Sequence, residues 1–175
     1  ASPRENRRHS ELDRFPKRQA RYAWTHGALH ALHLSRSTPY RHVNLSYADD
    51  RSVIAMAYAP IGVDLVALTP DAPELDHRIA SATDRAAVES LLGPIRTDLA
   101  AWAAKEAAAK LFDAVDVPPE DWRLQLRSDQ PDANLRIAGP NAMTATLAFR
   151  FWSPHYLIAV AQRGVSQPSI AMEAQ

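Results

Sequence analysis

The sequence predicts an α+β protein in which a helical block followed by a block of strands occurs twice. Three observations predict this order: apolar residues recur at helical spacing in two separate regions, short runs rich in β-branched residues follow each region, and turn-forming residues separate the runs. The chain has 175 residues, enough for one good core or two small cores that share an interface. We therefore expect a single compact unit with two lobes.

The first lobe is predicted to span residues 12–66, after a flexible charged arm over residues 1–11. Apolar residues in 12–34 recur at spacings compatible with one or two helices. Three apolar runs separated by turn residues then predict a three-strand meander. These runs are residues 43–47, 52–58 and 61–66.

The second lobe is predicted to span residues 78–164. Residues 67–77 hold prolines and acids without a clear period, so we interpret them as the connection between the lobes. A helix is predicted over 79–92, closed by Gly93, and a second, alanine-rich helix over 98–114, capped by Thr97. Strands are then predicted at residues 122–126, 135–137, 144–152 and 156–161, before a frayed tail over 165–175.

Composition and charge narrow the classes of protein. The chain has no cysteine, which excludes disulfide bonds and thiol catalysis. The longest nearly apolar stretch, residues 53–63, is far shorter than the roughly 20 residues that span a bilayer, so we expect a cytoplasmic protein without a membrane partner. Residues 1–42 carry a formal charge of +6 and the rest −6. This asymmetry suits an anionic ligand held by arginines and a divalent cation, although a solvated basic arm is the alternative.

Asp64 is the first candidate site residue. Strand alternation places it on one face with Gly62 and Val66. An acid among apolar neighbours is costly unless something pairs with it. Magnesium, which takes one or two protein carboxylates together with water and substrate phosphates, is one fitting partner. An arginine partner, or a cap on the following loop, is the alternative.

The second predicted helix supplies the other candidates. Trp102, Glu106 and Lys110 are four residues apart and share one face, with Lys105 turned away by about 100°. Glu106 and Lys110 could simply be an exposed ion pair, with Trp102 as a core anchor. Taken with Asp64, however, two carboxylates and an ammonium from different elements predict a metal site with a cation for a diphosphate.

These segments together resemble the signature segments of the 4'-phosphopantetheinyl transferases. That family has a strand ending in Gly-Val/Ile-Asp and a helix reading Trp-x-x-Lys-Glu-x-x-x-Lys, which match Gly62-Val63-Asp64 and the helix from Trp102 to Lys110. The segment Asn44-Leu45-Ser46-Tyr47 looks like the family's Asn-Leu/Ile-Ser-His strand, and residues 156–161 are similar to its closing strand. The resemblance extends from about residue 12 to residue 164, in the family's order.

The resemblance implies a fold and a reaction. The implied fold is two similar α/β halves related by a pseudo-twofold axis, each a helix on a small, mostly antiparallel sheet, with coenzyme A (CoA) and Mg²⁺ between them. The implied reaction transfers 4'-phosphopantetheine from CoA to a serine of an apo acyl or peptidyl carrier protein in fatty acid, polyketide or peptide synthesis. The resemblance also implies a monomer whose partners are CoA and the carrier protein. A nucleic-acid-binding module built on the basic N-terminal part is a third hypothesis, but no known motif or aromatic interleaving supports it, so we expect no nucleic-acid partner.

Residue roles follow from the same resemblance. Asp64 and Glu106 would bind Mg²⁺, and Glu106 would also accept the proton of the carrier serine. Lys110 would hold the pyrophosphate, with Lys105 as a weaker helper. The other positions that match contacts to CoA are Ser46, Tyr47 and Arg21, with Arg18 as a further candidate.

The sequence also departs from the family pattern. Tyr47 stands where a phosphate-binding histidine is usual, Val66 where many members have a third acidic ligand, and no Gly-Lys-Pro precedes the Asn-Leu-Ser strand. Arg36, Arg41 or His42 could supply the lost charge. The departures keep a second hypothesis open, a non-catalytic paralogue that binds CoA or a carrier protein.

Overall fold

A computed structural model describes residues 27, 41–49, 51–71, 73–127 and 134–164. The chain groups into two units, Ala1–Pro39 and Tyr40–Gln175. Of the first unit the structure describes Gly27 alone, which is helical. The predicted arm, the other residues of the predicted helices in 12–34, and the tail over 165–175 lie outside the described residues. All elements below belong to the second unit.

Two strands form a hairpin at the start of this unit. Strands β1 (His42–Ala48) and β2 (Arg51–Ala57) pair antiparallel as a two-stranded sheet, which confirms the first two predicted strands. The third strand, β3 (Ile61–Ala67), belongs to a different sheet, so the predicted three-strand meander is wrong at this point. Strand β3 lies beside β1, and the Val63 N–H donates to Oδ1 of Asn44 at 3.1 Å.

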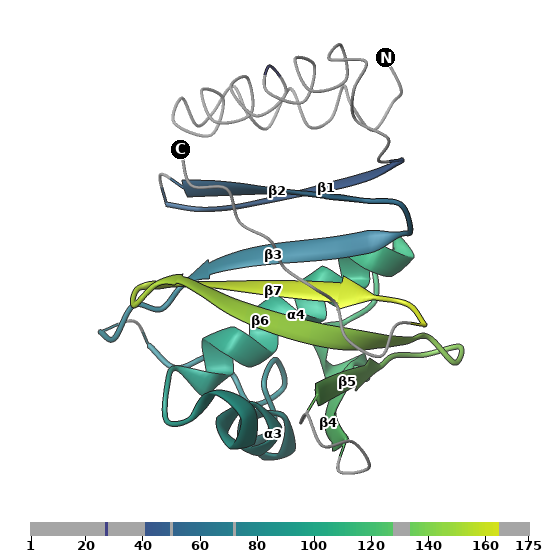
Figure 1. The fold of residues 1–175 in the computed structure, drawn as a ribbon. Helices are drawn as coiled ribbons and strands as arrows, with labels where there is room; N and C mark the ends of the chain where they lie inside the picture. The colour runs from purple at the N-terminus through teal and green to yellow at the C-terminus, as the bar shows by residue number, and fades with distance from the viewer. Residues whose placement is uncertain (1–26, 28–40, 50, 72, 128–133, 165–175) are drawn as a thin grey trace. The chain divides into compact units, whose positions relative to one another are not determined.

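A five-stranded antiparallel sheet forms the centre of the unit, with strand order β3-β7-β6-β5-β4 (Figure 1). Its other strands confirm the four predicted after the helices, each end within one residue. They are β4 (Arg123–Arg127), β5 (Asn134–Ala138), β6 (Thr144–Ser153) and β7 (Tyr156–Gln162). Strand β3 pairs with β7, with Asp64 opposite Ala159. The strand assigned to the first lobe is therefore an edge strand of the second lobe's sheet.

Two α-helices and a short 3-10 helix, η1 (Pro119–Asp121), precede the last four strands. Helix α3 (Ala82–Leu92) begins after Ser81 with a reciprocal capping box to Asp84, and ends at Gly93, whose φ is 77°. Helix α4 (Thr97–Phe112) is 16 residues long. The predicted cap at Thr97 is wrong, because Thr97 is the first helical residue and Arg96 precedes it without a side-chain cap. No helix in the described part of the chain is long and apolar enough to cross a membrane.

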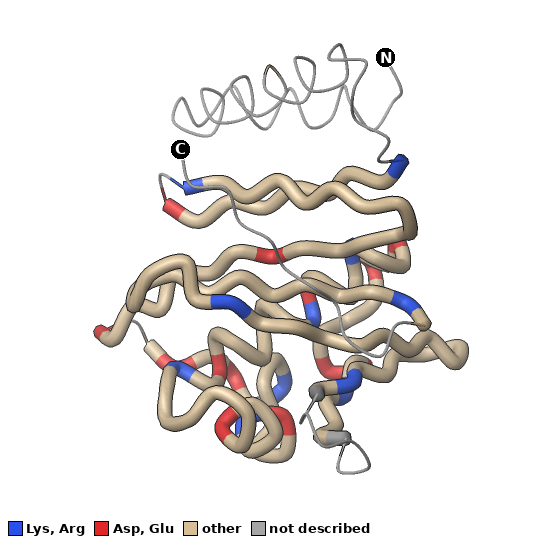
Figure 2. The backbone as a smooth tube through the Cα atoms, viewed as in Figure 1, with Lys and Arg blue, Asp and Glu red and all other residues tan. Residues whose placement is uncertain are grey.

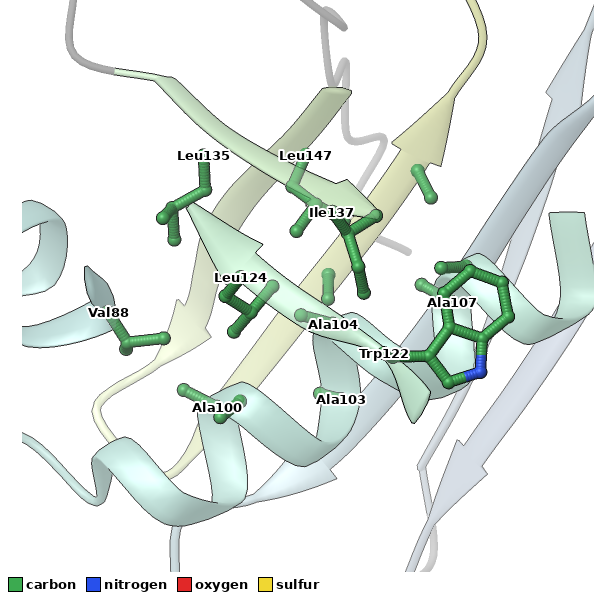
Figure 3. Close-up of a cluster of buried hydrophobic side chains, with 14 of the residues drawn as sticks. Val88, Ala100, Ala103, Ala104, Ala107, Trp122, Leu124, Leu135, Ile137 and Leu147 are labelled. Atoms are coloured by element: carbon green, nitrogen blue, oxygen red, sulfur yellow. The ribbon is translucent and has the colours of Figure 1, made fainter. Parts of the chain in front are cut away.

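The main core lies between α4 and the sheet, where the helix contributes alanines and the strands contribute branched residues (Figure 3). Six alanines of α4 in this core are completely buried: Ala100, Ala101, Ala103, Ala104, Ala107 and Ala108. Small side chains let the helix approach the sheet closely. On the other face of β3 and β7, a second cluster contains Val63 and Ile158 and packs against Val53 of β2. Strand β3 is thus covered on both faces.

The described elements confirm the α+β class and the antiparallel sheet. Residues 67–77, the predicted connection between lobes, join β3 to the region before α3 within one unit. The pseudo-twofold relation between two halves stays a prediction, because the helical region it requires, residues 12–34, lies outside the described residues apart from Gly27.

Candidate functional site

Close packing of α4 on β3 forms the site. A Cβ atom added at Gly62 would lie 1.9 Å from the carbonyl oxygen of Ala107 and 2.7 Å from the backbone nitrogen of Leu111. Only a residue without a side chain allows the two backbones to come this near. Since Asp64 shares the Gly62 face of the strand, its carboxylate points toward the same stretch of α4. It is the one charged residue on β3, and the rest of this strand is tan in Figure 2, the colour of residues other than Lys, Arg, Asp and Glu.

Lys110 of α4 binds Asp64 directly. Its Nζ donates to Oδ1 of Asp64 at 2.7 Å and to the carbonyl oxygens of Val63 at 3.1 Å and Leu45 at 3.4 Å. The Asp64 residue is 7% exposed and the Lys110 side chain 24%. The three N–H donors of the ammonium therefore each have an acceptor, and the helix, β3 and β1 meet at this one group.

Ser46 completes the contact from β1. Its Oγ is buried and donates to Oδ1 of Asp64 at 2.6 Å. Oδ2 of Asp64 accepts no hydrogen bond from the residues that the structure describes, which leaves it available to a ligand. The structure thus brings together three of the predicted site residues, Ser46, Asp64 and Lys110, by direct hydrogen bonds.

Glu106 lies one helical turn before Lys110 and is half-buried. Burial raises the pKa of its carboxyl group, the negative charge of Asp64 raises it further, and the ammonium of Lys110 lowers it in part. No hydrogen bond joins its carboxylate to another described residue. The ionised form of Glu106 is therefore disfavoured here, and a cation bound beside the carboxylate would stabilise it.

The donor set fits a magnesium ion. Asp64 and Glu106 carry two negative charges against one positive charge on Lys110, and Mg²⁺ is commonly bound by one or two carboxylates with water and substrate phosphates. No group of three or more histidine, aspartate or glutamate side chains suited to a metal occurs among the described residues. A magnesium ion here would thus take its remaining ligands from water and from the substrate.

A pocket of about 200 Å³ lies next to Glu106. It is lined by Trp102, Lys105, Glu106, Ala109, Val115, Val117, Pro119 and Trp122. Trp122 is 1% exposed, and its Nε1–H is the one buried side-chain donor or acceptor without a partner in the described part of the chain. Its ring packs on Gly139, where a Cβ would lie 2.5 Å away, and beside Phe112. Sequence reasoning missed Trp122 as a site residue, because it stood only as the start of a predicted strand.

Lys105 lies apart from the Asp64 group. It is 1% exposed, and its Nζ donates to Oδ2 of Asp84 and to the carbonyl oxygen of Ile79, each at 2.8 Å. Its ammonium is thus held at α3, while the rest of the residue lines the pocket. The structure does not bring Lys105 to Lys110 and Asp64 as the predicted helper of the pyrophosphate contact.

The remaining predicted positions lie on β1, on β3 or outside the described residues. Tyr47 follows Ser46 on β1, so it takes the opposite face of the strand, and it is 40% exposed. Val66 packs against the main core beside α4. Arg21, Arg18 and Arg36 lie outside the described residues.

No protein-family model matches this chain. No curated protein matches it either.

Proposed function

We propose that this protein transfers 4'-phosphopantetheine from CoA to a serine of an apo acyl or peptidyl carrier protein, with Mg²⁺. The observation that carries the proposal is the convergence of Ser46, Asp64 and Lys110 through hydrogen bonds, with Glu106 one turn away on α4. These residues come from the three segments that resemble the family motifs. Their placement on one site is not required by the local sequence of any one segment.

The charges of the site suit a pyrophosphate substrate. Lys110 supplies a compact positive charge for the pyrophosphate, and Asp64 and Glu106 would hold the magnesium ion, which neutralises charge on the phosphate oxygens when bound. The elevated pKa of Glu106 suits a proton acceptor, because it brings the carboxyl group nearer to neutral pH.

The proposed chemical step uses Glu106 as the proton acceptor and Lys110 as the cation for the leaving group. The carrier serine oxygen forms a bond to the phosphorus that carries the pantetheine arm, and its proton passes to Glu106. The bond from that phosphorus to the bridging oxygen breaks, and adenosine 3',5'-bisphosphate leaves. Lys110 stabilises the negative charge of this leaving group.

The pocket beside Glu106 supports the same proposal. It is adjacent to the residue that would act at the transferred phosphorus, so a chain attached to that phosphorus has space there. The ring of Trp122 lines this space and would contact the arm.

Intact-mass spectrometry of apo carrier proteins tests the proposal. The carriers are incubated with CoA, Mg²⁺ and the wild type, Glu106→Gln or Glu89→Gln; a parallel set contains EDTA. We expect one added phosphopantetheine with the wild type and with Glu89→Gln, whose glutamate is exposed on α3, and none with Glu106→Gln or EDTA. Normal transfer by Glu106→Gln would refute the assigned role of this carboxylate.

A second candidate is a non-catalytic paralogue that binds CoA or a carrier protein. The observation in its favour is Tyr47, a neutral and exposed residue where the resembling family usually has a phosphate-binding histidine. Titration calorimetry with CoA separates the two candidates. Magnesium-dependent CoA binding without transfer to any carrier favours the paralogue, whereas binding with transfer favours the enzyme.

A further inference from the structure

A buried ion pair joins α3, α4 and β4. Nζ of Lys105 lies 2.8 Å from Oδ2 of Asp84, and the two side chains are 1% and 0% exposed. Asp84 belongs to the first turn of α3, and its Oδ1 accepts the backbone N–H of Leu124 on β4 at 2.9 Å. One carboxylate therefore connects three elements of the unit.

The polar atoms of this pair have hydrogen-bond partners. Oδ2 of Asp84 also accepts from Oγ of Ser81 at 2.8 Å and from its backbone N–H at 3.1 Å, and Lys105 also donates to the carbonyl oxygen of Ile79 at 2.8 Å. Burial opposes ionisation of Asp84, but the hydrogen bonds from Leu124, Lys105 and Ser81 together lower its pKa. These hydrogen bonds thus favour the charged form of the Asp84 carboxylate.

This ion pair makes it costly for the Lys105 ammonium to bind a phosphate. A shift of Nζ to a bound phosphate would leave the charge of Asp84 in the protein interior without its cation. Removing one partner of a buried, hydrogen-bonded ion pair is far more costly than losing an exposed pair. Lys105 is therefore committed to Asp84, and the phosphates must be met by other cations.

The pair also links α4, which lines the pocket, to β4, which begins directly after the pocket residue Trp122. Lys105 directly precedes Glu106 on α4, and Leu124 follows Trp122 by two residues. Lys105, Glu106 and Trp122 all line the pocket. A displacement of α4 from β4 would therefore move Glu106 relative to Trp122.

From this geometry we infer that Lys105 is a positioning residue, which holds Glu106 in place through Asp84 and does not bind CoA. The activity readout of this inference rests on the proposed function. The structural readouts do not depend on it.

The experiment compares Lys105→Met, Asp84→Asn and the double variant with the wild type. Each single variant leaves one buried charge unpaired and should lower the melting temperature by roughly 10 °C, whereas the double variant should recover at least half of this loss. Hydrogen exchange in α4 and β4 should become faster in the single variants and return toward the wild-type rate in the double variant. The exposed ion pair of Arg78 with Asp76 gives the matched control, because Arg78→Met should change little.

Activity separates positioning from phosphate binding. In Lys105→Met we expect kcat to fall about tenfold or more, with the Kd for CoA within about threefold of wild type, and in the double variant we expect most of kcat to return. Loss of CoA affinity in both Lys105→Met and the double variant would overturn the inference, since it would show that the Lys105 ammonium binds CoA. Unchanged kcat and exchange in Lys105→Met would also overturn it.

Two further outcomes concern variants that do not fold and a wild type without activity. If the single variants do not fold, a folded double variant with wild-type CoA affinity supports the inference, and a double variant that also fails to fold overturns it. If the wild type neither binds CoA nor transfers phosphopantetheine, the proposed function fails. Melting and hydrogen exchange then still decide whether the pair fixes α4 against β4.

Discussion

Replacing Gly62 by alanine tests whether the approach of α4 to β3 positions the site. The added Cβ would lie 1.9 Å from the carbonyl oxygen of Ala107, whereas real Cβ atoms keep at least about 3.0 Å. Both of its nearest neighbours, at 1.9 and 2.7 Å, are backbone atoms of α4, so no side-chain rotation can relieve the overlap. The helix and the strand must separate by about 1 Å.

This separation has two expected costs. Overpacking of a core typically lowers the free energy of unfolding by about 1–3 kcal/mol, which corresponds to a decrease of roughly 2–12 °C in the melting temperature of a chain of this size. The same shift moves Glu106 and Lys110 away from Asp64. A misplacement of about 1 Å can slow a reaction about 100-fold, so we expect the transfer rate in Gly62→Ala to fall by this order.

The assays are thermal unfolding and the initial rate of carrier modification, measured on the same preparation. Gly27→Ala is the matched control, because Gly27 is helical and exposed and a Cβ there meets nothing within 4 Å. Alanine in an exposed helix is favoured over glycine by up to about 1 kcal/mol, so this variant should be as stable as the wild type or more stable. A Gly62→Ala variant with wild-type melting temperature and wild-type rate would refute the reasoning.

Three further predictions concern other parts of the unit. The fold raises the pKa of Glu106 above the ordinary glutamate value of 4.5, so ionisation of Glu106 destabilises the protein as pH rises. Near pH 7, Glu106→Gln should therefore have a higher free energy of unfolding than the wild type, as measured by urea denaturation. At pH values below that ordinary value the two proteins should differ little. Burial opposes ionisation of Asp98, but hydrogen bonds, chiefly from Arg96, lower its pKa to about 2. Asp98→Asn should therefore lower the free energy of unfolding by about 1–3 kcal/mol near pH 7. This difference should vanish as pH falls toward the pKa of about 2, as followed by acid-dependent unfolding. Gly139→Ala would place a Cβ 2.5 Å from the ring of Trp122, so tryptophan emission should shift and the CoA affinity should fall, as measured by fluorescence and calorimetry; an unchanged spectrum and affinity would count against the assigned pocket.

Local sequence patterns predicted most of the described elements. The strands after α4 agree with prediction to within one residue at each end, because their apolar runs end at turn-forming residues. Gly93 ends α3 as predicted, since its φ of 77° is unfavourable for other residues. The predicted start of this helix at residue 79 was three residues early, because the backbone N–H groups of Ile79 and Ala80 bond to the carbonyl oxygen of Asp76 in a turn.

The partner of β3 could not be predicted from its own residues. The alternation of Ile61–Ala67 placed Gly62 and Asp64 together on one face, as the structure confirms, but it is equally compatible with pairing to β2 or to a distant strand. The choice of β7 depends on covering both faces of β3. One face packs on α4 and the other on the hairpin of β1 and β2, and only the whole fold provides both.

A site residue was predictable from the sequence where its own segment carries a recognisable motif. Ser46, Asp64 and Lys110 were selected from three motifs, and the structure joins them by hydrogen bonds. The position of Lys105 was not predictable in this way. Helical spacing showed that it faces away from Lys110, but its partner Asp84 lies 21 residues earlier on another helix, and no local pattern identifies it.

Helix α4 combines two requirements that explain why its two lysines have different roles. Its alanine-rich surface allows close contact with the sheet, but alanines have no polar group that fixes how far the helix slides or rotates. Directional ion pairs at two points of the helix supply this constraint: Lys105 to Asp84 near its middle and Lys110 to Asp64 near its end. The first pair is completely buried and can stay closed, whereas the second is partly exposed and can open to an anionic substrate. Glu106 lies between these two fixed points, so its position relative to Asp64 depends on both.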